Sequence, residues 1–256
     1  MHILITNDDG VDSPGLLALG QAMRTIAEVS VLAPDHNWSA SGHVKTLHRP
    51  LRVWPTCLAD GSPALATDGA PSDCVALALL GLVERPIDLV VSGINPYANI
   101  GHDVTYSGTV TAAMEAALAG LPAMSVSLDS VEAPSTADAF RTAAEVASQL
   151  ATRVLELNLP PGVLLNVNVP SRPRAELAGI LLTRQGTRVF HDSLVRREDP
   201  RGRPYYWIGG GAPSADSEPG TDSRALADGF VSVTPLQLDL TAYPALEALG
   251  SLIRPL

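Results

Sequence analysis

The sequence has almost no lysine, few aromatic residues, only two cysteines and no long apolar run. Lys45 is the one lysine among 17 basic residues, and 27 acidic residues give a formal net charge of −10. A chain of this sign cannot displace counterions from a polyanion, which excludes a nucleic-acid or acidic-membrane partner. The longest run of apolar residues and glycine, 75–83, is far shorter than the ~20 residues of a membrane-spanning helix. Cys57 and Cys74 suit a reducing compartment and are too few for a metal cage.

The remaining composition is that of a globular protein. Hydrophobic residues make up 46% of the 256 residues, which is enough for a sizeable core. The first ten residues, MHILITNDDG, carry two acids and no basic leader, unlike a secretory signal. We therefore expect a soluble cytoplasmic protein. Because only one lysine is present, a phosphate site would have to use arginine, backbone N–H groups or a metal.

The order of predicted strands and helices indicates an α/β fold. Residues 2–6 (HILIT) and 28–33 (EVSVLA) are apolar runs typical of buried strands. Between them, Ser13 and Pro14 begin a helix, with serine as the N-cap. This strand–helix–strand unit opens a Rossmann-like, mostly parallel sheet in a three-layer core. The pattern continues with strands expected at 87–91, 124–128 and 164–170, and helices at 72–82 with Ser72 as N-cap, 108–119 and 135–156.

Two parts of the chain are expected outside the core. Residues 43–54 and 63–67 predict an inserted β-hairpin. After Pro170 the sequence is rich in Arg, Pro, Gly and Asp, although 205–208 (YYWI) is strongly strand-prone and 230–241 returns as strand. We therefore divide the chain into a catalytic core, 1–170, and a C-terminal arm and hairpin region, 171–256, that completes the same domain. Aromatic residues on a projecting arm are often covered by a partner subunit, which favours a homo-oligomer.

Polar residues follow the first strand where it ends. Asn7, Asp8, Asp9 and Gly10 stand at the carboxyl end of a predicted parallel strand, where open α/β sheets bind ligands. Two adjacent carboxylates repel each other unless a cation lies between them or one is protonated. An all-oxygen pair suits Mg²⁺, Mn²⁺ or Ca²⁺ rather than zinc. The alternative is an Asp-rich turn that caps the following helix.

Three more loops are expected at the same sheet edge. The loop 92–103 offers the amide of Asn95, and the loop 34–43 offers the Ser39 hydroxyl and His43. The sequence 107–109 (SGT) begins a helix, whose free N–H groups and positive dipole end can cradle a phosphate. Each signal also has an ordinary explanation: an Asn/Gly turn, a surface histidine, or N-capping by Ser107. Glu115, on the same helix, is equally explained as a buried acid that pairs with an arginine or a backbone group.

The convergence of these groups is more informative than any one of them. Two carboxylates, a hard metal and an anion cradle together make up a metal-assisted phosphoryl hydrolase. The metal would lower the pKa of a bound water and hold a phosphate oxygen, while the helix N-terminus would stabilise charge on the others.

Motifs that cover nearly the whole chain, in order, resemble those of the SurE survival-protein phosphatases. They are ILITNDDG (3–10), APDHNWSASGH (33–43), TDGAPSDCV (67–75), DLVVSGINPYANIGHDVTYSGTVTAAMEAA (88–117), LLNVNVP (164–170), DPRGRPYYWIG (199–209) and GTDSRALADGFVSVTPL (220–236). The resemblance implies a divalent-metal-dependent phosphatase that acts on nucleoside 5′- and 3′-monophosphates. It also implies a Rossmann-like core, one Mg²⁺, Mn²⁺ or similar ion per subunit, and a C-terminal arm exchanged within a homodimer or homotetramer.

The resemblance also implies roles for residues at matching motif positions. The metal ligands would be Asp8, Asp9, Ser39 and Asn95. The phosphate would be surrounded by Asn95, Ser107, Gly108 and Thr109, with Asn99 and Asp103 in a second tier. The residues expected to be catalytic are Asp8, Asp9, Asn95 and Ser107.

Two positions depart from the family pattern. Ala40 and Tyr97 stand where the family usually has glycine. Neither change removes an implied ligand, so activity is expected. A side chain at position 97 is expected to narrow the mouth of the site or alter the choice of leaving group.

Several alternatives stay open at this point. The general acid could be Asp9, His43, His102 or Asp103, or solvent for a good leaving group. A zinc deacetylase with an Asp-Asp pair would use His36 and His43, but no histidine immediately precedes the acids. A sensor that binds a metal–nucleotide complex without turnover is the non-enzymatic alternative, and Tyr97 is the feature that supports it.

Overall fold

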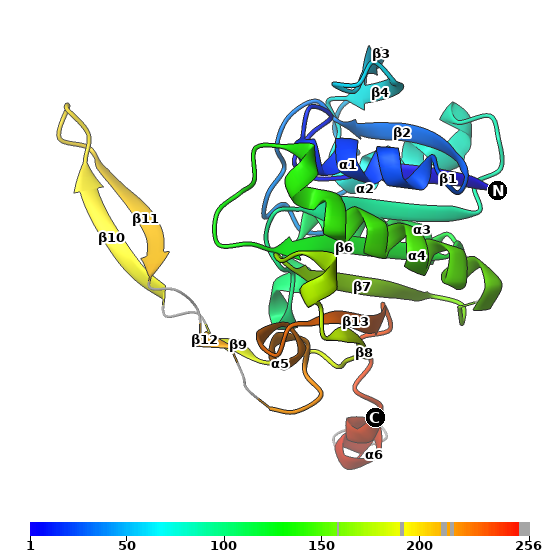
Figure 1. Ribbon diagram of the computed structural model, residues 1–256. Helices are drawn as coiled ribbons and strands as arrows, with labels where there is room; N and C mark the ends of the chain where they lie inside the picture. The colour runs from blue at the N-terminus through cyan, green and yellow to red at the C-terminus, as the bar shows by residue number, and fades with distance from the viewer. Residues whose placement is uncertain (158, 190–191, 211–213, 216–217, 251–256) are drawn as a thin grey trace.

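The computed structural model describes residues 1–256 except 158, 190–191, 211–213, 216–217 and 251–256 (Figure 1). Its strands in the central sheet are β1 (His2–Thr6), β2 (Glu28–Pro34), β3 (Val53–Cys57), β4 (Pro63–Thr67), β5 (Leu89–Asn95), β6 (Ala123–Asp129), β7 (Val163–Pro170), β8 (Gly179–Leu182) and β13 (Phe230–Gln237). The helices are α1 (Pro14–Met23), α2 (Pro71–Leu77), α3 (Gly108–Leu118), α4 (Arg141–Leu157), α5 (Asp222–Ala227) and α6 (Tyr243–Leu249). Four further strands lie outside the central sheet: β9 (Arg188–Val189), β10 (Asp192–Glu198), β11 (Pro204–Gly210) and β12 (Ser214–Ala215).

The nine strands of the central sheet follow the order β3-β4-β2-β1-β5-β6-β7-β13-β8. All neighbours are parallel except β3 against β4 and β13 against β7. Helices cover both faces, which gives three layers (Figure 1). The predicted α/β fold with a mostly parallel sheet is therefore confirmed.

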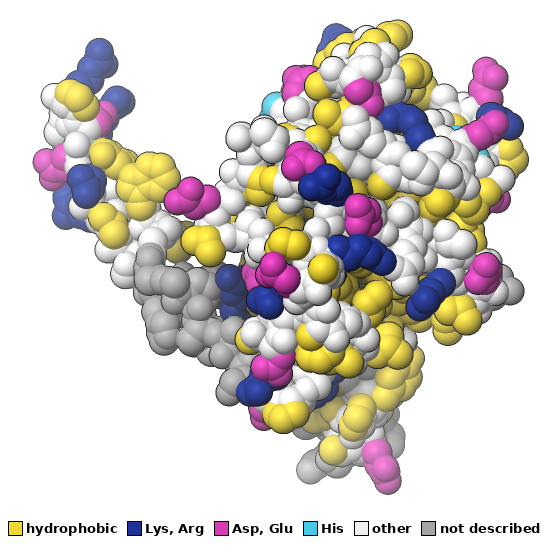
Figure 2. All heavy atoms as spheres, in the orientation of Figure 1, with side chains coloured by type: hydrophobic (Ala, Val, Ile, Leu, Met, Phe, Trp, Pro, Cys, Tyr) yellow, Lys and Arg dark blue, Asp and Glu magenta, His cyan; other side chains and the backbone are white. Residues whose placement is uncertain are grey.

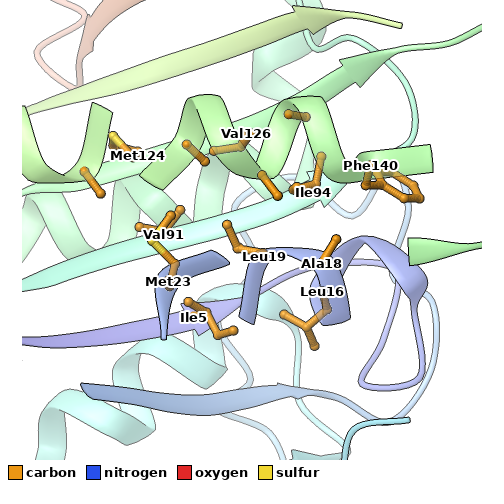
Figure 3. Close-up of a cluster of buried hydrophobic side chains, with 14 of the residues drawn as sticks. Ile5, Leu16, Ala18, Leu19, Met23, Val91, Ile94, Met124, Val126 and Phe140 are labelled. Carbon is orange, nitrogen blue, oxygen red and sulfur yellow. The ribbon is translucent and has the colours of Figure 1, made fainter. Parts of the chain in front are cut away.

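Successive side chains along the strands pack into two separate hydrophobic cores, one on each face of the sheet. In β1 every residue is buried, and Ile3 and Ile5 face the α1 and α4 layer while Leu4 faces the α2 and α3 layer. This is the two-residue period of a strand covered on both faces. From α1, Leu16, Leu19 and Met23 lie one helical turn apart and point toward the sheet (Figure 3).

The predicted N-cap of α1 is confirmed, and that of α2 is wrong. The Ser13 hydroxyl accepts the Leu16 N–H at 3.2 Å. The second helix begins one residue before Ser72, at Pro71, and is capped by Ala70. The Asp73 carboxylate accepts the Ala70 N–H at 2.9 Å, so an acid within the first turn replaces the serine that the sequence suggested. The helix ends at Leu77 and continues as a wider π-type turn to residue 82.

Other boundaries also differ from those expected. The hairpin of β3 and β4 is present, but β4 pairs with β2, so it is the edge of the central sheet rather than an insertion, and residues 43–52 are not strand. β5 continues past residue 91 to Asn95, and β13 ends at Gln237 instead of residue 241. The helix expected at 135–156 begins as a 3₁₀ turn (Ala137–Phe140) before α4.

The C-terminal third of the chain contributes both to the body and to a projecting hairpin. β8 and β13 extend the central sheet, whereas β10 and β11 pair antiparallel and stand away from it (Figure 1). Among the described residues, no helix combines the length and the apolar composition that crossing a membrane requires.

Asp222 joins the two parts of the chain. Its carboxylate is fully buried at the start of α5 and accepts the N–H groups of Gly101, Gly186 and Ser223, each at 2.8 Å. The loop after β5 is thereby fixed to the start of α5, 121 residues away in sequence, and the same carboxylate also holds Gly186 in the segment before the hairpin.

Replacing this carboxylate tests how much the connection stabilises the fold. Asp222→Ala leaves three buried N–H groups without their acceptor, and should lower the free energy of unfolding by about 3–5 kcal/mol in urea titrations. The matched control is Asp228→Ala, which removes an exposed pair with Arg224 and should cost under about 1 kcal/mol. Equal effects of the two substitutions would contradict the connection.

Candidate metal and phosphate site

A cavity of about 490 Å³ lies at the carboxyl ends of the central strands. β1 lies between β2 and β5, and the connections through α1 and α2 run over opposite faces, so the loops diverge at this point and leave a crevice. The residues that line the cavity are Asp8, Ser39, Ala40, Asn95, Tyr97, Ala98, Asn99, Asp103, Tyr106, Ser107 and Arg188. The cavity therefore brings together six of the predicted site residues, namely Asp8, Ser39, Asn95, Asn99, Asp103 and Ser107.

Asp8 is buried against the first turn of α3. The Thr109 hydroxyl donates a hydrogen bond to its carboxylate. A Cβ added at Gly108 would lie 2.7 Å from the Asp8 Cβ, so only glycine allows this close approach. Burial raises the pKa of Asp8, and the hydrogen bond from Thr109 opposes the rise.

Asp9 borders a neighbouring cavity of about 320 Å³ rather than the main one. The Asn37 amide donates to its carboxylate at 3.3 Å. Burial, together with the charge of Asp8, raises the pKa of Asp9 to about 7. Two ionised carboxylates are therefore unfavourable here without a cation, which would stabilise both.

The donor set fits a hard cation. Within the described residues, no three His, Cys, Asp or Glu side chains cluster as a metal site, so any ion bound here needs oxygen ligands of other kinds. Asn95 and Ser39 offer an amide and a hydroxyl on the cavity wall. The Asn95 Nδ2 donates to the Tyr97 carbonyl at 2.5 Å, which directs the amide so that its oxygen is the atom available to a cation. Two carboxylates, an amide and a hydroxyl suit Mg²⁺ or Mn²⁺.

Ser107 is the N-cap of α3, as the sequence predicted. Its hydroxyl oxygen accepts the Val110 N–H at 3.1 Å, so its hydroxyl hydrogen can be donated elsewhere. The N-terminus of an 11-residue helix thus meets the cavity beside Asp8. Backbone N–H groups and the helix dipole make such an end favourable for an anion.

Two asparagines of β7 hydrogen-bond to the backbone of Asn99 and hold it in place. Its N–H donates to the Asn168 side chain at 2.8 Å, and its carbonyl accepts from Asn166 and Asn168 at 2.8 and 3.0 Å. Its own amide donates to the Ser127 hydroxyl at 2.9 Å. Sequence reasoning missed this network. The available signal was a pair of asparagines in the otherwise apolar strand LLNVNVP.

Glu115 anchors the loop that carries Ser39. It is mostly buried, and its carboxylate oxygens lie 3.0 Å from His43 Nε2 and 2.8 Å from Lys45 Nζ. The sequence predicted that Glu115 would pair with an arginine or a backbone group, but its partners are His43 and Lys45, the one lysine of the chain. Between Ser39 and this anchor, Ala40 has a φ of +58°, which costs a side-chain-bearing residue roughly 1–2 kcal/mol. The family's glycine would avoid this strain.

Arg188 is a charged residue of the cavity that the sequence did not predict. Its guanidinium pairs with Asp103, which also lines the cavity. Burial raises the pKa of Asp103, and Arg188 opposes the rise. Because Arg188 comes from the segment before the projecting hairpin, only the tertiary fold brings it here.

The histidines considered as ligands or acids are not on the cavity wall. His36 contacts Asp35 at 2.5 Å, and His43 is engaged by Glu115. His102 is exposed. Neither His36 nor His43 is among the described lining residues, which disfavours a zinc deacetylase.

The fold and the site together define a doubly wound α/β protein with an oxygen-rich cavity at its strand ends. The family model described as "Survival protein SurE" matches residues 3–192, and the chain belongs to this family. The predicted family is therefore confirmed.

Full-length relatives extend the match to nearly the whole chain. The "5′-nucleotidase SurE" of Chloroflexus aggregans is 52% identical over 249 residues, covering 97% of this chain and 98% of that one. The "5′-nucleotidase SurE 1" of Thermus thermophilus is 52% identical over 256 residues, covering 99% and 98%. The crystal structure of the SurE protein from Aquifex aeolicus has a TM-score of 0.82 at 38% identity, covering 98% and 99%.

The raised pKa of Asp9 predicts how pH changes the stability of the metal-free protein. Its folded pKa of about 7 exceeds the unfolded value near 4, so the folded state holds a proton that the unfolded state has released. Stability is therefore lost as the pH rises through 7. In chelator, Asp9→Asn should be more stable than wild type at pH 8, on the order of 2–3 kcal/mol, and similar at pH 4. Asp12→Asn, which changes an exposed acid nearby, is the control. A difference independent of pH would contradict this origin.

Proposed function

We propose that the protein is a divalent-metal-dependent phosphomonoesterase that hydrolyses nucleoside 5′- and 3′-monophosphates to nucleoside and phosphate. The observation that carries this proposal is the burial of Asp8 against the first turn of α3, on the wall it shares with Ser39 and Asn95. A cation site and an anion site are thereby adjacent. Membership of the SurE family and the 5′-nucleotidase names of its relatives support the substrate class.

One Mg²⁺, Mn²⁺ or similar ion per subunit would be held by Asp8, Asp9, Ser39 and Asn95. When bound, such an ion supplies a Lewis acid and a bound water of lowered pKa. Asp9, whose carboxylate accepts a hydrogen bond from Asn37, lines the neighbouring cavity and would complete the ligand set from that side.

The phosphate would lie at the N-terminus of α3. The backbone N–H groups of Gly108 and Thr109 would bind its oxygens, and the Ser107 hydroxyl would donate its hydrogen while its oxygen caps the helix. Thr109 uses its own hydroxyl to hold Asp8, so it links the two halves of the site. Fixed donors of this kind stabilise the charge that develops on a phosphate in the transition state.

Asp103 shares the cavity with Asp8, and is therefore the candidate for protonating the leaving group. Burial raises its pKa and the Arg188 guanidinium lowers it, so the ion pair with Arg188 would have to open before Asp103 donated a proton. Of the other candidates, His43 is occupied by Glu115, and Asp9 is already assigned to the proposed metal site.

We further propose that the projecting hairpin is exchanged or covered in a homodimer or homotetramer. Opposite residues of β10 and β11 share a face, so Leu194 pairs with Ile208 on one face and Val195 with Trp207 on the other. Apolar side chains on both faces are exposed, with Trp207 at 64% and Ile208 at 82%. Figure 2 shows apolar side chains gathered on the visible side of the hairpin. A two-stranded hairpin is only marginally stable alone, which favours a partner that covers it.

A cytoplasmic location is the remaining part of the proposal. Cys57 and Cys74 are both free thiols, as is usual in reducing compartments. The substrate is a small molecule, and the net charge of −10 opposes binding to a nucleic-acid polymer.

Asp8→Asn tests the enzyme directly. It removes a ligand charge and keeps the shape of the side chain, so phosphate release from 5′-AMP with Mn²⁺ should fall at least ~100-fold. Circular dichroism and thermal melting should stay close to wild type. Chelator should abolish the activity of wild type, and added Mn²⁺ should restore it.

The control for this experiment is Asp12→Asn, whose activity should be unchanged. An Asp8→Asn protein with more than about a tenth of wild-type activity would refute the ligand role of Asp8. Wild-type protein that binds AMP with Mn²⁺ and releases no phosphate would instead establish the sensor.

Substitutions on the hairpin test the proposed oligomer. Leu194→Ser combined with Trp207→Ser removes one apolar anchor from each face, and should reduce the mass measured by light scattering to that of one chain. Val131→Ser, at a fully exposed position in the body of the protein, is the control and should leave the mass unchanged. An unchanged mass in the double variant would rule out the hairpin as the interface.

A further inference from the structure

The cavity is larger than a phosphate group requires. Its volume of about 490 Å³ is in the range of pockets that enclose a whole organic ligand. Asp8, Ser39, Asn95 and Ser107 account for the metal and the phosphate. The wall that is left is formed mainly by Tyr97, Ala98, Asp103, Tyr106 and Arg188.

This remaining wall is close to neutral. Among the residues that the structure describes, this wall has two charged side chains, Asp103 and Arg188, and they form an ion pair with each other. A second phosphate or another strongly charged group would have to compete with that pair. The remaining wall therefore suits an uncharged organic group, which in a phosphate ester is the leaving alcohol.

Two tyrosines lie beside the phosphate end of the cavity. Tyr106 immediately precedes Ser107, and the Tyr97 carbonyl accepts the Asn95 amide at 2.5 Å. Their side chains are 66% and 48% exposed, so ring surface is available to a ligand. A phosphate bound by Asn95 and Ser107 consequently has an aromatic residue next to each of these contacts.

We propose that Tyr97 is a specificity residue that stacks on the base of the leaving nucleoside, so that the enzyme selects nucleotides over phosphate esters of aliphatic alcohols. The inference rests on the function proposed above and adds which part of the substrate is recognised. A planar aromatic ring with an exposed face binds any nucleobase by stacking and is tolerant of its identity. Tyr97 thus favours nucleotides as a class, with little choice among bases.

The test compares two substrates that share the phosphate and the ribose, 5′-AMP and ribose 5-phosphate. The variants are Tyr97→Ala, Tyr97→Phe, which keeps the ring, and Tyr97→Leu, which keeps bulk without it. Tyr97→Ala should lower kcat/KM for 5′-AMP by about 5- to 150-fold, the usual strength of base stacking, and change that for ribose 5-phosphate less than about twofold. Tyr97→Phe should resemble wild type, and Tyr97→Leu should resemble Tyr97→Ala.

Retained hydrolysis of ribose 5-phosphate shows that each variant is folded and that its phosphate site is intact. Tyr243→Ala, an exposed tyrosine outside the cavity, is the matched control and should change neither substrate. Equal losses for both substrates would mean that Tyr97 only supports Asn95, and would overturn the proposal. A gain with 5′-AMP in Tyr97→Ala would mean that the ring obstructs the site, and a Leu variant equal to Phe would mean that bulk alone matters; either result would also overturn it. Wild-type protein inactive on both esters would instead refute the proposed phosphatase.

Discussion

The contact between Asp8 and the first turn of α3 is the constraint on which the candidate site depends. It brings a carboxylate from the end of β1 within van der Waals distance of a helix N-terminus, and only a glycine at position 108 permits it. Thr109 fixes the orientation of the carboxylate through its hydroxyl. A negative side chain thereby occupies the positive end of a helix dipole, at a place that also offers donors to an anion. The proposed cation and anion positions are adjacent because Asp8 and Ser107, the N-cap of α3, line the same cavity.

Burial of the two neighbouring carboxyl groups is unfavourable for their ionised forms unless a cation binds beside them. Burial raises the pKa of both Asp8 and Asp9, so the folded protein withholds solvent from two acids without giving either a basic side-chain partner in the described residues. Such a site exists only because other contacts keep the loops in place. Asp222 and the asparagines of β7 hold the loop after β5, and Glu115 holds the loop after β2. These contacts therefore offset the cost of burying the two acids, a cost that a bound cation would reduce.

The sequence predicted the parts of this structure that are encoded locally. An apolar run ending in Asn-Asp-Asp-Gly marks β1, and Ser13 and Ser107 are true N-caps because each stands directly before its helix. Ser72 failed as a cap because Pro71 already occupies the first helical turn and Asp73 supplies the acceptor. In these cases neighbours within three or four residues decide the outcome.

Contacts between distant segments were not predictable in the same way. The place of β4 beside β2 depends on sheet pairing, and a two-residue period alone does not reveal which strand a hairpin will join. Arg188 meets Asp103 across 85 residues, and Asn166 meets Asn99 across 67. The asparagines stand out in the apolar strand LLNVNVP, but no local pattern shows which distant segment they or Arg188 will contact. Family resemblance supplied the loops that hold the proposed ligands, but the residues that hold those loops became visible only in three dimensions.

The two departures from the family pattern have different physical consequences, and this difference bears on function. Ala40 has a positive φ beside Ser39, so its methyl group adds backbone strain next to a proposed ligand. Tyr97 adds an aromatic side chain to the cavity wall while its backbone carbonyl keeps the Asn95 amide in place. The side chain at position 97 can therefore vary without moving the atoms proposed to hold metal or phosphate. Positions with this property are where one phosphatase scaffold can change its substrates, because binding of the leaving group is separated from the chemistry at phosphorus.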